Sequence, residues 1–358
     1  LVAHIHVLKL LQDRLRAEYW FAEHPEIRKR PLVPPVVVIG PMRSGTTRLH
    51  RLLAADRRFS HLRMFETMCP VPRPDELNRH DKRPRMAATA LAVLHHVNPA
   101  TAAVHPSGPM EPEEELGLFI SSAWGMKHEV QWRVPSYTRW CEAEDSTPAY
   151  EAMADLLRLT GWLRGDDPEK PWLLKTPQHM TSLPALLRVF PDARIIFIHR
   201  DPARVVGSTC SLVWNQMKVH SDHADRAWIG REWLRKTKVK VRRMRDARAI
   251  IPEARRIDVL YDEMDRDWRG AMKRVYRFLD LDIAPAEPAM ADYMARSGRN
   301  RALGLHRYQL QSFGLEAAEV HEAFRDYVQD FSIPRAAPAR QGPKMKPRPD
   351  RRVAAARA

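Results

Sequence analysis

The chain has 358 residues, of which 44% are hydrophobic and 29% are charged, and its formal net charge is +15. This length allows a full hydrophobic core, and this composition is typical of a globular protein rather than a disordered one. Its apolar runs fall far short of the ~20 residues that a transmembrane helix requires. The three cysteines are widely spaced and odd in number, which suits a reducing compartment and predicts a cytoplasmic protein.

The first predicted element is a helix over residues 1–24. Its sequence, LVAHIHVLKLLQDRLRAEYW, carries Lys9, Asp13 and Arg14 inside an apolar pattern. A signal peptide needs an uninterrupted apolar run, so the pattern indicates an amphipathic helix instead.

Residues 34–53, PPVVVIGPMRSGTTRLHRLL, predict a buried strand, a tight turn and a helix. Gly40 and Gly45 have the spacing of the nucleotide-binding motif G-x-x-x-x-G-K-[ST], but Thr46 stands at the lysine position and Arg43 supplies a cation earlier in the turn. Free N–H groups at the start of the helix, threonine hydroxyls and a guanidinium can together hold a phosphate-like group without a metal ion. An ordinary strand-to-helix turn is the alternative.

A predicted helical insertion covers residues of about 85–165. The segment MEPEEELGLF places Glu113, Glu114 and Glu115 at the expected start of a helix, where carboxylates complement the helix dipole; contact with a substrate is the alternative. Four tryptophans of this region fit core packing better than the lining of an apolar pocket, since aromatic side chains dominate cores. They are Trp124, Trp132, Trp140 and Trp162.

A second candidate anion-binding turn is FIHRDPARVVGS, residues 197–208. Asp201 is a natural N-cap and Pro202 suits the first helical position, so Arg200 lies at the carboxyl end of a strand, where open α/β sheets bind ligands. Ser208 lies two turns along the following helix, within reach of the same ligand. A structural ion pair is an equally good account of Arg200.

Two segments carry much of the positive charge. Residues 231–256 have eleven basic and three acidic side chains, and the Pro-rich tail, residues 334–358, has eight basic side chains and one Asp. A solvated helix face and a disordered tail are favoured over specific nucleic-acid binding, which stays an alternative.

Short apolar strands alternate with helices along the chain, which predicts an α/β fold: a P-loop-like three-layer structure with a central parallel sheet flanked by helices. We expect a single domain over residues 1–333 with its core at 34–281. The expected strands are Val36–Gly40, Trp172–Leu174, Arg194–His199 and Ile257–Tyr261. Helices are expected at about Glu113–Ala123, Ala149–Leu163, Thr181–Phe190, Pro202–Met217, Arg226–Ile250 and Glu263–Leu279.

The motifs GPMRSGTT and IFIHRDPARVVGS, together with WLLKTPQH and FETMCPVP, resemble the sulfotransferases that depend on 3′-phosphoadenosine-5′-phosphosulfate (PAPS), especially the bacterial branch related to tyrosylprotein sulfotransferases. The resemblance spans about Val36 to Leu281. It implies that the 5′-phosphosulfate is cradled by Arg43, Ser44, Gly45, Thr46 and Thr47. It also implies that the 3′-phosphate is held by Arg200 and Ser208, that Tyr261 lies beside the donor, and that a further C-terminal cation comes from Arg299, Arg301 or Arg307.

Two catalytic residues follow from the same resemblance. Glu66, in HLRMFETMCP, matches the family's general base, and Lys175, at the end of WLLK, matches the residue that stabilises the sulfuryl group and the departing phosphate. From the residues alone, Glu66 is a surface or helix-capping carboxylate and Lys175 is the partner of a nearby acid. A core tyrosine accounts equally well for Tyr261.

The resemblance implies sulfuryl transfer to a hydroxyl acceptor, either a small molecule or a lipid or glycan, with no metal ion. A P-loop NTPase or small-molecule kinase is the alternative enzyme class, because RIDVLYDE, residues 256–263, offers a Walker-B-like acid.

Overall fold

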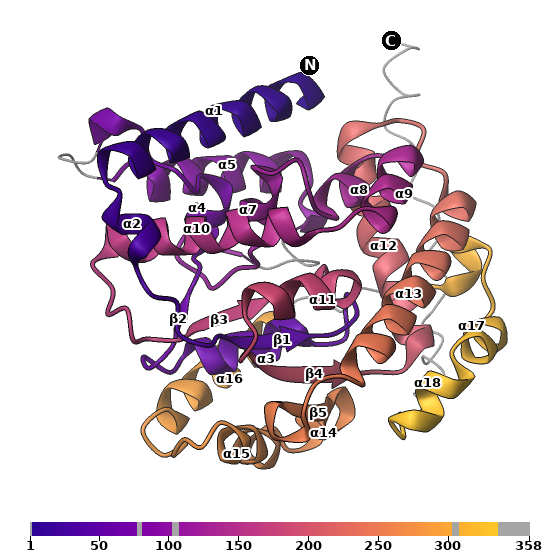
Figure 1. Cartoon of the computed structure of the whole chain (residues 1–358). Coiled ribbons are helices and arrows are strands. Elements are labelled where there is room, and N and C mark those ends of the chain that lie inside the picture. Colours follow the sequence, from indigo (N-terminus) through magenta and orange to yellow (C-terminus); the bar gives the residue numbers. More distant parts are fainter. Residues whose placement is uncertain (1, 77–80, 102–106, 303–307, 336–358) are drawn as a thin grey trace, which may run out of the picture.

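The computed structural model describes residues 2–76, 81–101, 107–302 and 308–335, and the predicted tail beyond residue 335 lies outside them. Its central feature is a parallel sheet of five strands in the order β2-β3-β1-β4-β5 (Figure 1). The strands are β1 (Val36–Ile39), β2 (Ser60–His61), β3 (Trp172–Lys175), β4 (Arg194–His199) and β5 (Arg256–Leu260). The predicted fold class is therefore confirmed.

The register of the central strands determines which residues meet at the edge of the sheet. Val38 of β1 lies opposite Lys175, the last residue of β3, and Ile39 lies opposite Phe197 of β4. The carboxyl ends of β1, β3 and β4 therefore lie side by side. The edge strand β2 was not predicted, because two residues are too few to give a sequence pattern.

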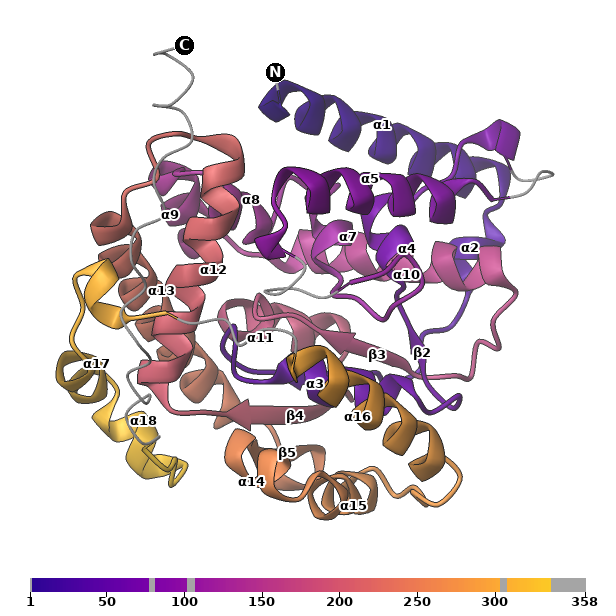
Figure 2. The same cartoon turned by 180° about the vertical axis from the view of Figure 1, so that it is seen from behind.

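Alternate residues of the strands pack on opposite faces of the sheet. Val37 and Ile39 join the core beneath α11 (His179–Val189) and α13 (Arg226–Arg248), which cover the face seen in Figure 1. Val36 and Val38 join the core beneath the helices of the other face (Figure 2). These helices are α3 (Thr46–Ala54), α14 (Tyr261–Arg266), α15 (Trp268–Phe278) and α16 (Glu287–Ala302).

The predicted insertion forms a helical layer between β2 and β3 in the chain, next to the N-terminal helix (Figures 1 and 2). Its described helices are α5 (Arg83–Val97), α7 (Leu116–Ile120), α8 (Lys127–Gln131), α9 (Pro135–Ala143) and α10 (Thr147–Arg164). The short helix α4 (Met64–Met68) precedes the predicted bounds and lies in the same layer, beside α1 (Val2–Glu23) and α2 (Glu26–Lys29) (Figures 1 and 2). The remaining helices are α12 (Pro202–His220), α17 (Ala317–Ala323) and α18 (Arg325–Asp330), with 3₁₀ turns at Pro74–Glu76, Glu253–Arg255 and Leu310–Phe313.

Two predicted helices differ from the structure. The helix expected over Glu113–Ala123 is shorter, because it ends before Ala123, which adopts a positive φ of 53°. The helix expected over Glu263–Leu279 is divided into α14 and α15. The division falls at Asp267, whose carboxylate accepts a hydrogen bond from the Gly270 amide and so caps a new helix.

The tryptophans of the insertion are not all core residues. Trp124 is buried, but Trp140 is 46% exposed, and both line a groove of about 380 Å³ between α1 and α10. Among the described helices, none combines the length and the apolar character needed to cross a bilayer.

Candidate active site

The turn between β1 and α3 is closely packed around two glycines. Gly45 has a φ of 98°, and a Cβ added there would lie 2.6 Å from Cδ2 of Tyr261. A Cβ on Gly40 would lie 2.6 Å from Cγ2 of Ile198. Ser44 between them is fully buried, and its Oγ has no hydrogen-bond partner among the described residues. The turn therefore contains a buried donor beside the free N–H groups that begin α3.

The residues predicted to bind the sulfuryl donor in the two turns are in contact with one another. Arg43 Nε donates to Ser208 Oγ at 3.0 Å, and Arg200 Nη1 donates to the Arg43 carbonyl oxygen at 2.7 Å. The Arg200 guanidinium lies 3.9 Å above the Tyr261 ring. Burial and the neighbouring Arg200 cation both lower the pKa of Arg43 from its ordinary value. Two guanidinium groups held this close form a site that favours an anion.

The first turn of α3 carries the remaining residues that were predicted to bind the sulfuryl donor. It also carries a cation that the sequence did not indicate. Thr46 is buried and Thr47 is partly exposed, both at the helix start. Arg48, the third residue of α3, donates to the Tyr261 hydroxyl at 3.3 Å and pairs with Asp265 at 2.9 Å. Arg48 therefore fixes the ring on which Arg200 lies, and no motif in the sequence indicates this contact.

The end of β4 is anchored from beneath. His199 is buried and bonds the Tyr327 hydroxyl through Nδ1 and Asp258 through Nε2, both at 2.9 Å. Asp258, one of the acids of the segment RIDVLYDE, also pairs with Arg248 and is therefore used in these contacts. Burial lowers the pKa of His199, which keeps the ring neutral.

The predicted cap of the next helix is present. The Asp201 carboxylate accepts a hydrogen bond from the Ala203 amide at 2.9 Å, and it also contacts Nε2 of His321 at 2.9 Å. The C-terminal helices thus contact both sequence neighbours of Arg200, because Tyr327 bonds His199 and His321 contacts Asp201.

Lys175 lies at the end of β3 and has 1% of its side chain exposed. Its ammonium donates to Glu114 Oε1 at 2.5 Å, and its backbone amide donates to Glu115 Oε2 at 3.0 Å. Glu115 also contacts His179 Nε2 at 2.5 Å, and His179 Nδ1 contacts the Tyr150 hydroxyl at 2.7 Å. The acidic cluster was expected to complement a helix dipole, but these two carboxylates bind the end of β3 instead.

A further buried group was missed by the sequence analysis. His50 of α3 is fully buried, and neither ring nitrogen has a hydrogen-bond partner in the described part of the chain. Burial, and then the positive charge of Lys175, lower its pKa well below the ordinary value. His50 is therefore neutral and lies within the electrostatic influence of Lys175.

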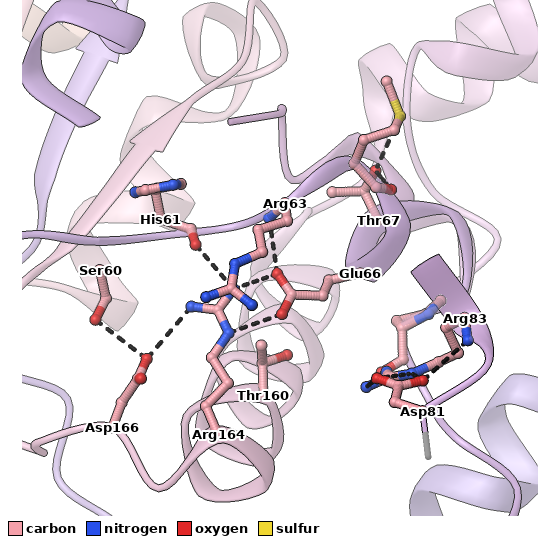
Figure 3. Close-up of polar contacts among 12 residues, drawn as sticks. Ser60, His61, Arg63, Glu66, Thr67, Asp81, Arg83, Thr160, Arg164 and Asp166 are labelled. Atoms are coloured by element: carbon pink, nitrogen blue, oxygen red, sulfur yellow. Dashed lines mark hydrogen bonds and ion pairs between the residues drawn. The ribbon is translucent and has the colours of Figure 1, made fainter. Parts of the chain in front are cut away.

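Glu66 is the third residue of α4 and is held in a buried ion pair (Figure 3). Its Oε1 accepts a hydrogen bond from Arg164 Nε at 2.7 Å, and its Oε2 accepts from the Arg63 amide at 2.7 Å and pairs with Arg164 Nη2. Arg164 also donates to the His61 carbonyl oxygen at 2.9 Å. The carboxylate is thus 2% exposed and bound on both oxygens.

The segments that carry the two groups of carboxylates run side by side. The Met64 amide donates to the Glu111 carbonyl oxygen, and the Glu113 amide donates to that of Leu62, both at 2.9 Å. Farther along, α7 packs so closely on α4 that a Cβ on Gly117 would lie 1.9 Å from the Thr67 carbonyl oxygen. This pairing fixes both segments beside the end of β3.

The sequence model of the sulfotransferase family matches residues 34–285. The match covers well over half of the chain and includes the whole sheet, both candidate anion-binding turns and the helical insertion. The chain belongs to the sulfotransferase family.

Two solved sulfotransferases resemble the chain over most of their length. The crystal structure of STF1 from Mycobacterium tuberculosis superposes with a TM-score of 0.76 at 30% identity, covering 89% of this chain and 83% of that one. STF9 from Mycobacterium avium gives 0.75 at 29%, covering 91% and 84%. The omega-hydroxy-beta-dihydromenaquinone-9 sulfotransferase Stf3 of M. tuberculosis is 25% identical over 290 residues, 73% of this chain and 67% of that protein.

In this sulfotransferase, Arg43, Arg200, Ser208 and Tyr261 are brought together at one edge of the sheet. Glu66 is engaged with Arg164 on α10. For the expected C-terminal cation, the side chains of Arg299 and Arg301 and the whole of Arg307 lie outside the described residues. Within the described ranges, no group of three or more His, Cys, Asp or Glu residues could hold a metal ion.

Proposed function

We propose that this sulfotransferase transfers the sulfuryl group of PAPS to a hydroxyl acceptor. The observation that carries the proposal is the pair of guanidinium groups at the ends of β1 and β4. Arg200 touches the backbone of Arg43, and Arg43 touches Ser208, so two turns far apart in sequence form one cationic site. PAPS carries a phosphate on the 3′ oxygen and a phosphosulfate on the 5′ oxygen of its ribose, and two adjacent candidate anion-binding turns match that charge distribution.

One turn is suited to the 5′-phosphosulfate of the donor and the other turn to its 3′-phosphate. The turn after β1 offers the Ser44 hydroxyl, which has no hydrogen-bond partner among the described residues, to the phosphosulfate. It also offers the N–H groups of the first turn of α3 and the hydroxyls of Thr46 and Thr47. Arg200 and Ser208 offer a planar cation and a hydroxyl to the 3′-phosphate, beside Tyr261. The 3′-phosphate would then distinguish PAPS from ATP-like nucleotides.

In the proposed reaction the acceptor oxygen attacks sulfur in line, a new S–O bond forms, and the bond to the 5′-phosphate oxygen breaks with its electron pair. Lys175 and the loop from Arg43 to Thr47 stabilise the charge on the sulfuryl group and on the leaving phosphate. The acceptor's proton passes to Glu66, our proposed general base. Because Arg164 holds this carboxylate, proton transfer requires that acceptor binding opens the ion pair.

The acceptor is proposed to be a small-molecule, lipid or glycan hydroxyl. The Stf3 relatives are sulfotransferases of a hydroxylated menaquinone, which supports the lipid option. We further propose a cytoplasmic enzyme that needs no metal ion and binds no specific nucleic acid. Its proposed organisation is one catalytic domain over residues 1–333, with an acceptor-side insertion and a basic tail.

The test is a comparison of ligands by thermal unfolding. Desulfated donor, 3′-phosphoadenosine-5′-phosphate (PAP), should stabilise the protein more than ADP or ATP does. At a ligand concentration a hundredfold above Kd, the added stability is ~2.7 kcal/mol. Equal stabilisation by ADP and PAP would contradict the proposal, and a preference for ATP would favour a kinase or NTPase.

A matched pair of variants sharpens the test. Arg200→Ala should reduce the affinity for PAP and leave the affinity for ADP nearly unchanged, because ADP lacks the 3′-phosphate. Arg188→Ala is the control, since Arg188 is exposed and pairs with the exposed Asp145. Equal losses for both ligands in Arg200→Ala would show that Arg200 does not read the 3′-phosphate.

A further inference from the structure

Glu114 is placed among the cations that the proposed donor would use. Its carboxylate contacts the Lys175 ammonium at 2.5 Å. Its negative charge also reaches Arg43, whose pKa it raises against the larger effects of burial and of Arg200. A carboxylate in this place neutralises the charges that would otherwise attract an anion.

The fold does not depend on Glu114 in the way it depends on the adjacent carboxylate. Glu115 is 1% exposed and holds the backbone amide of Lys175 together with His179. The Glu114 side chain is 16% exposed, and in the described part of the chain its carboxylate accepts a hydrogen bond from the Lys175 ammonium alone. Its backbone amide is held separately, by the Glu113 carboxylate at 2.9 Å. The Glu114 carboxylate can therefore leave Lys175 without breaking the contacts that fix this segment.

We infer that Glu114 is the counter-ion of Lys175 in the donor-free enzyme, that the donor's phosphosulfate displaces it, and that it returns to Lys175 as PAP leaves. The inference rests on the proposed function, because it requires Lys175 to bind the donor. Glu114 is thus a positioning residue. It keeps the buried ammonium paired when the site is empty, and it competes with the 5′-phosphate of the product.

If Glu114 competes with PAP for Lys175, removing the charge of Glu114 should raise the affinity for PAP. A buried lysine without a counter-ion is costly, so any anion that replaces Glu114 must first break a charged hydrogen bond. Glu114→Gln keeps the size of the side chain but removes its charge, so PAP no longer competes with a carboxylate. We expect PAP to bind about tenfold more tightly to Glu114→Gln, mostly through slower dissociation.

The experiment measures PAP binding to the full chain by calorimetry and stopped-flow dissociation. Glu114→Gln and Glu114→Ala are compared with the wild type and with Glu111→Gln. Glu111 is a suitable control, because it lies on the same segment with an exposed side chain, 3.7 Å from Arg51. The control should leave the affinity for PAP unchanged, and its thermal unfolding reports whether substitution in this segment disturbs folding.

A double-mutant cycle tests whether the gain in PAP affinity depends on Lys175. If Glu114 acts through Lys175, the gain in PAP affinity should shrink to less than about threefold when Lys175 is already Met. An equal gain in both backgrounds would show simple repulsion and overturn the exchange. Unchanged or weaker PAP binding by both Glu114 variants would also overturn it. If wild-type protein fails to bind PAP, the proposed function itself is wrong, so the two failures are distinguishable.

Discussion

Replacing Glu66 by Gln should destabilise the protein through a buried ion pair. The carboxylate receives hydrogen bonds from Arg164 Nε and from the Arg63 amide, and it pairs with Arg164 Nη2. The amide of Gln has one acceptor oxygen, so at least one of these contacts becomes a donor facing a donor. The loss of one or two charged hydrogen bonds at ~1.5 kcal/mol each gives about 1.5–3 kcal/mol.

Urea unfolding measures this loss of stability. The same measurement is made on Arg164→Met and on the double variant. If the pair is coupled, the two single variants each lose stability, and the double variant loses less than their sum. Strict additivity, or an unchanged free energy of unfolding in Glu66→Gln, would refute the reasoning.

Turnover of the same variants tests the proposed base. Glu66→Gln should lose about 10²–10⁴-fold in kcat with unchanged PAP affinity. Arg164→Met leaves the carboxylate in place and should lose much less. Equal losses in the two variants would assign Glu66 a structural role.

Lys175→Ala should slow turnover by about 10²–10³-fold while weakening PAP binding far less, because the ammonium acts on charge that develops during transfer. Kinetics and calorimetry measure the two effects, and equal losses would assign Lys175 to binding alone. Gly117→Ala should lower the free energy of unfolding by about 1–3 kcal/mol, since the added Cβ meets the Thr67 carbonyl; an unchanged urea midpoint would contradict this. Burial lowers the pKa of His61 and of His128 to about 4, so the neutral rings stabilise the fold above pH 6.5. That stability should be lost between pH 6.5 and about 4, by up to ~1.4 kcal/mol per pH unit for each ring, and a flat profile would count against it. Dialysis against EDTA should leave activity unchanged, and a loss restored by Mg²⁺ would argue for a metal.

The sheet and the two turns were predictable from the sequence because their signals are local. An apolar run followed by Gly40 marks the end of β1, and one followed by Arg-Asp-Pro marks the end of β4, which has the predicted bounds of Arg194–His199. Parallel strands place their carboxyl ends at one edge, so the proximity of Arg43 and Arg200 follows from topology. The fold class and the family were therefore within reach of the sequence alone.

The partners of the candidate catalytic residues were not predictable in the same way. Glu66 meets Arg164 across 98 residues, and Lys175 meets Glu114 across 61. Such pairs depend on how the insertion folds over the sheet, and no spacing rule encodes them. The burial of His50 beside Lys175 depends on the same packing of α3 under β3.

The contacts at the end of β4 show that the folded unit extends beyond the segment that the family model matches. The family match finishes at residue 285, yet Asp201 and His199 are secured by His321 and Tyr327, and Phe331 stacks on the His199 ring at 4.0 Å. A chain truncated at residue 285 would retain the proposed phosphate ligands Arg43–Thr47, Arg200 and Ser208. It would nevertheless expose the imidazole to water and free the backbone on either side of Arg200. Helices α17 and α18 thus support the backbone on either side of Arg200, the residue proposed to bind the 3′-phosphate.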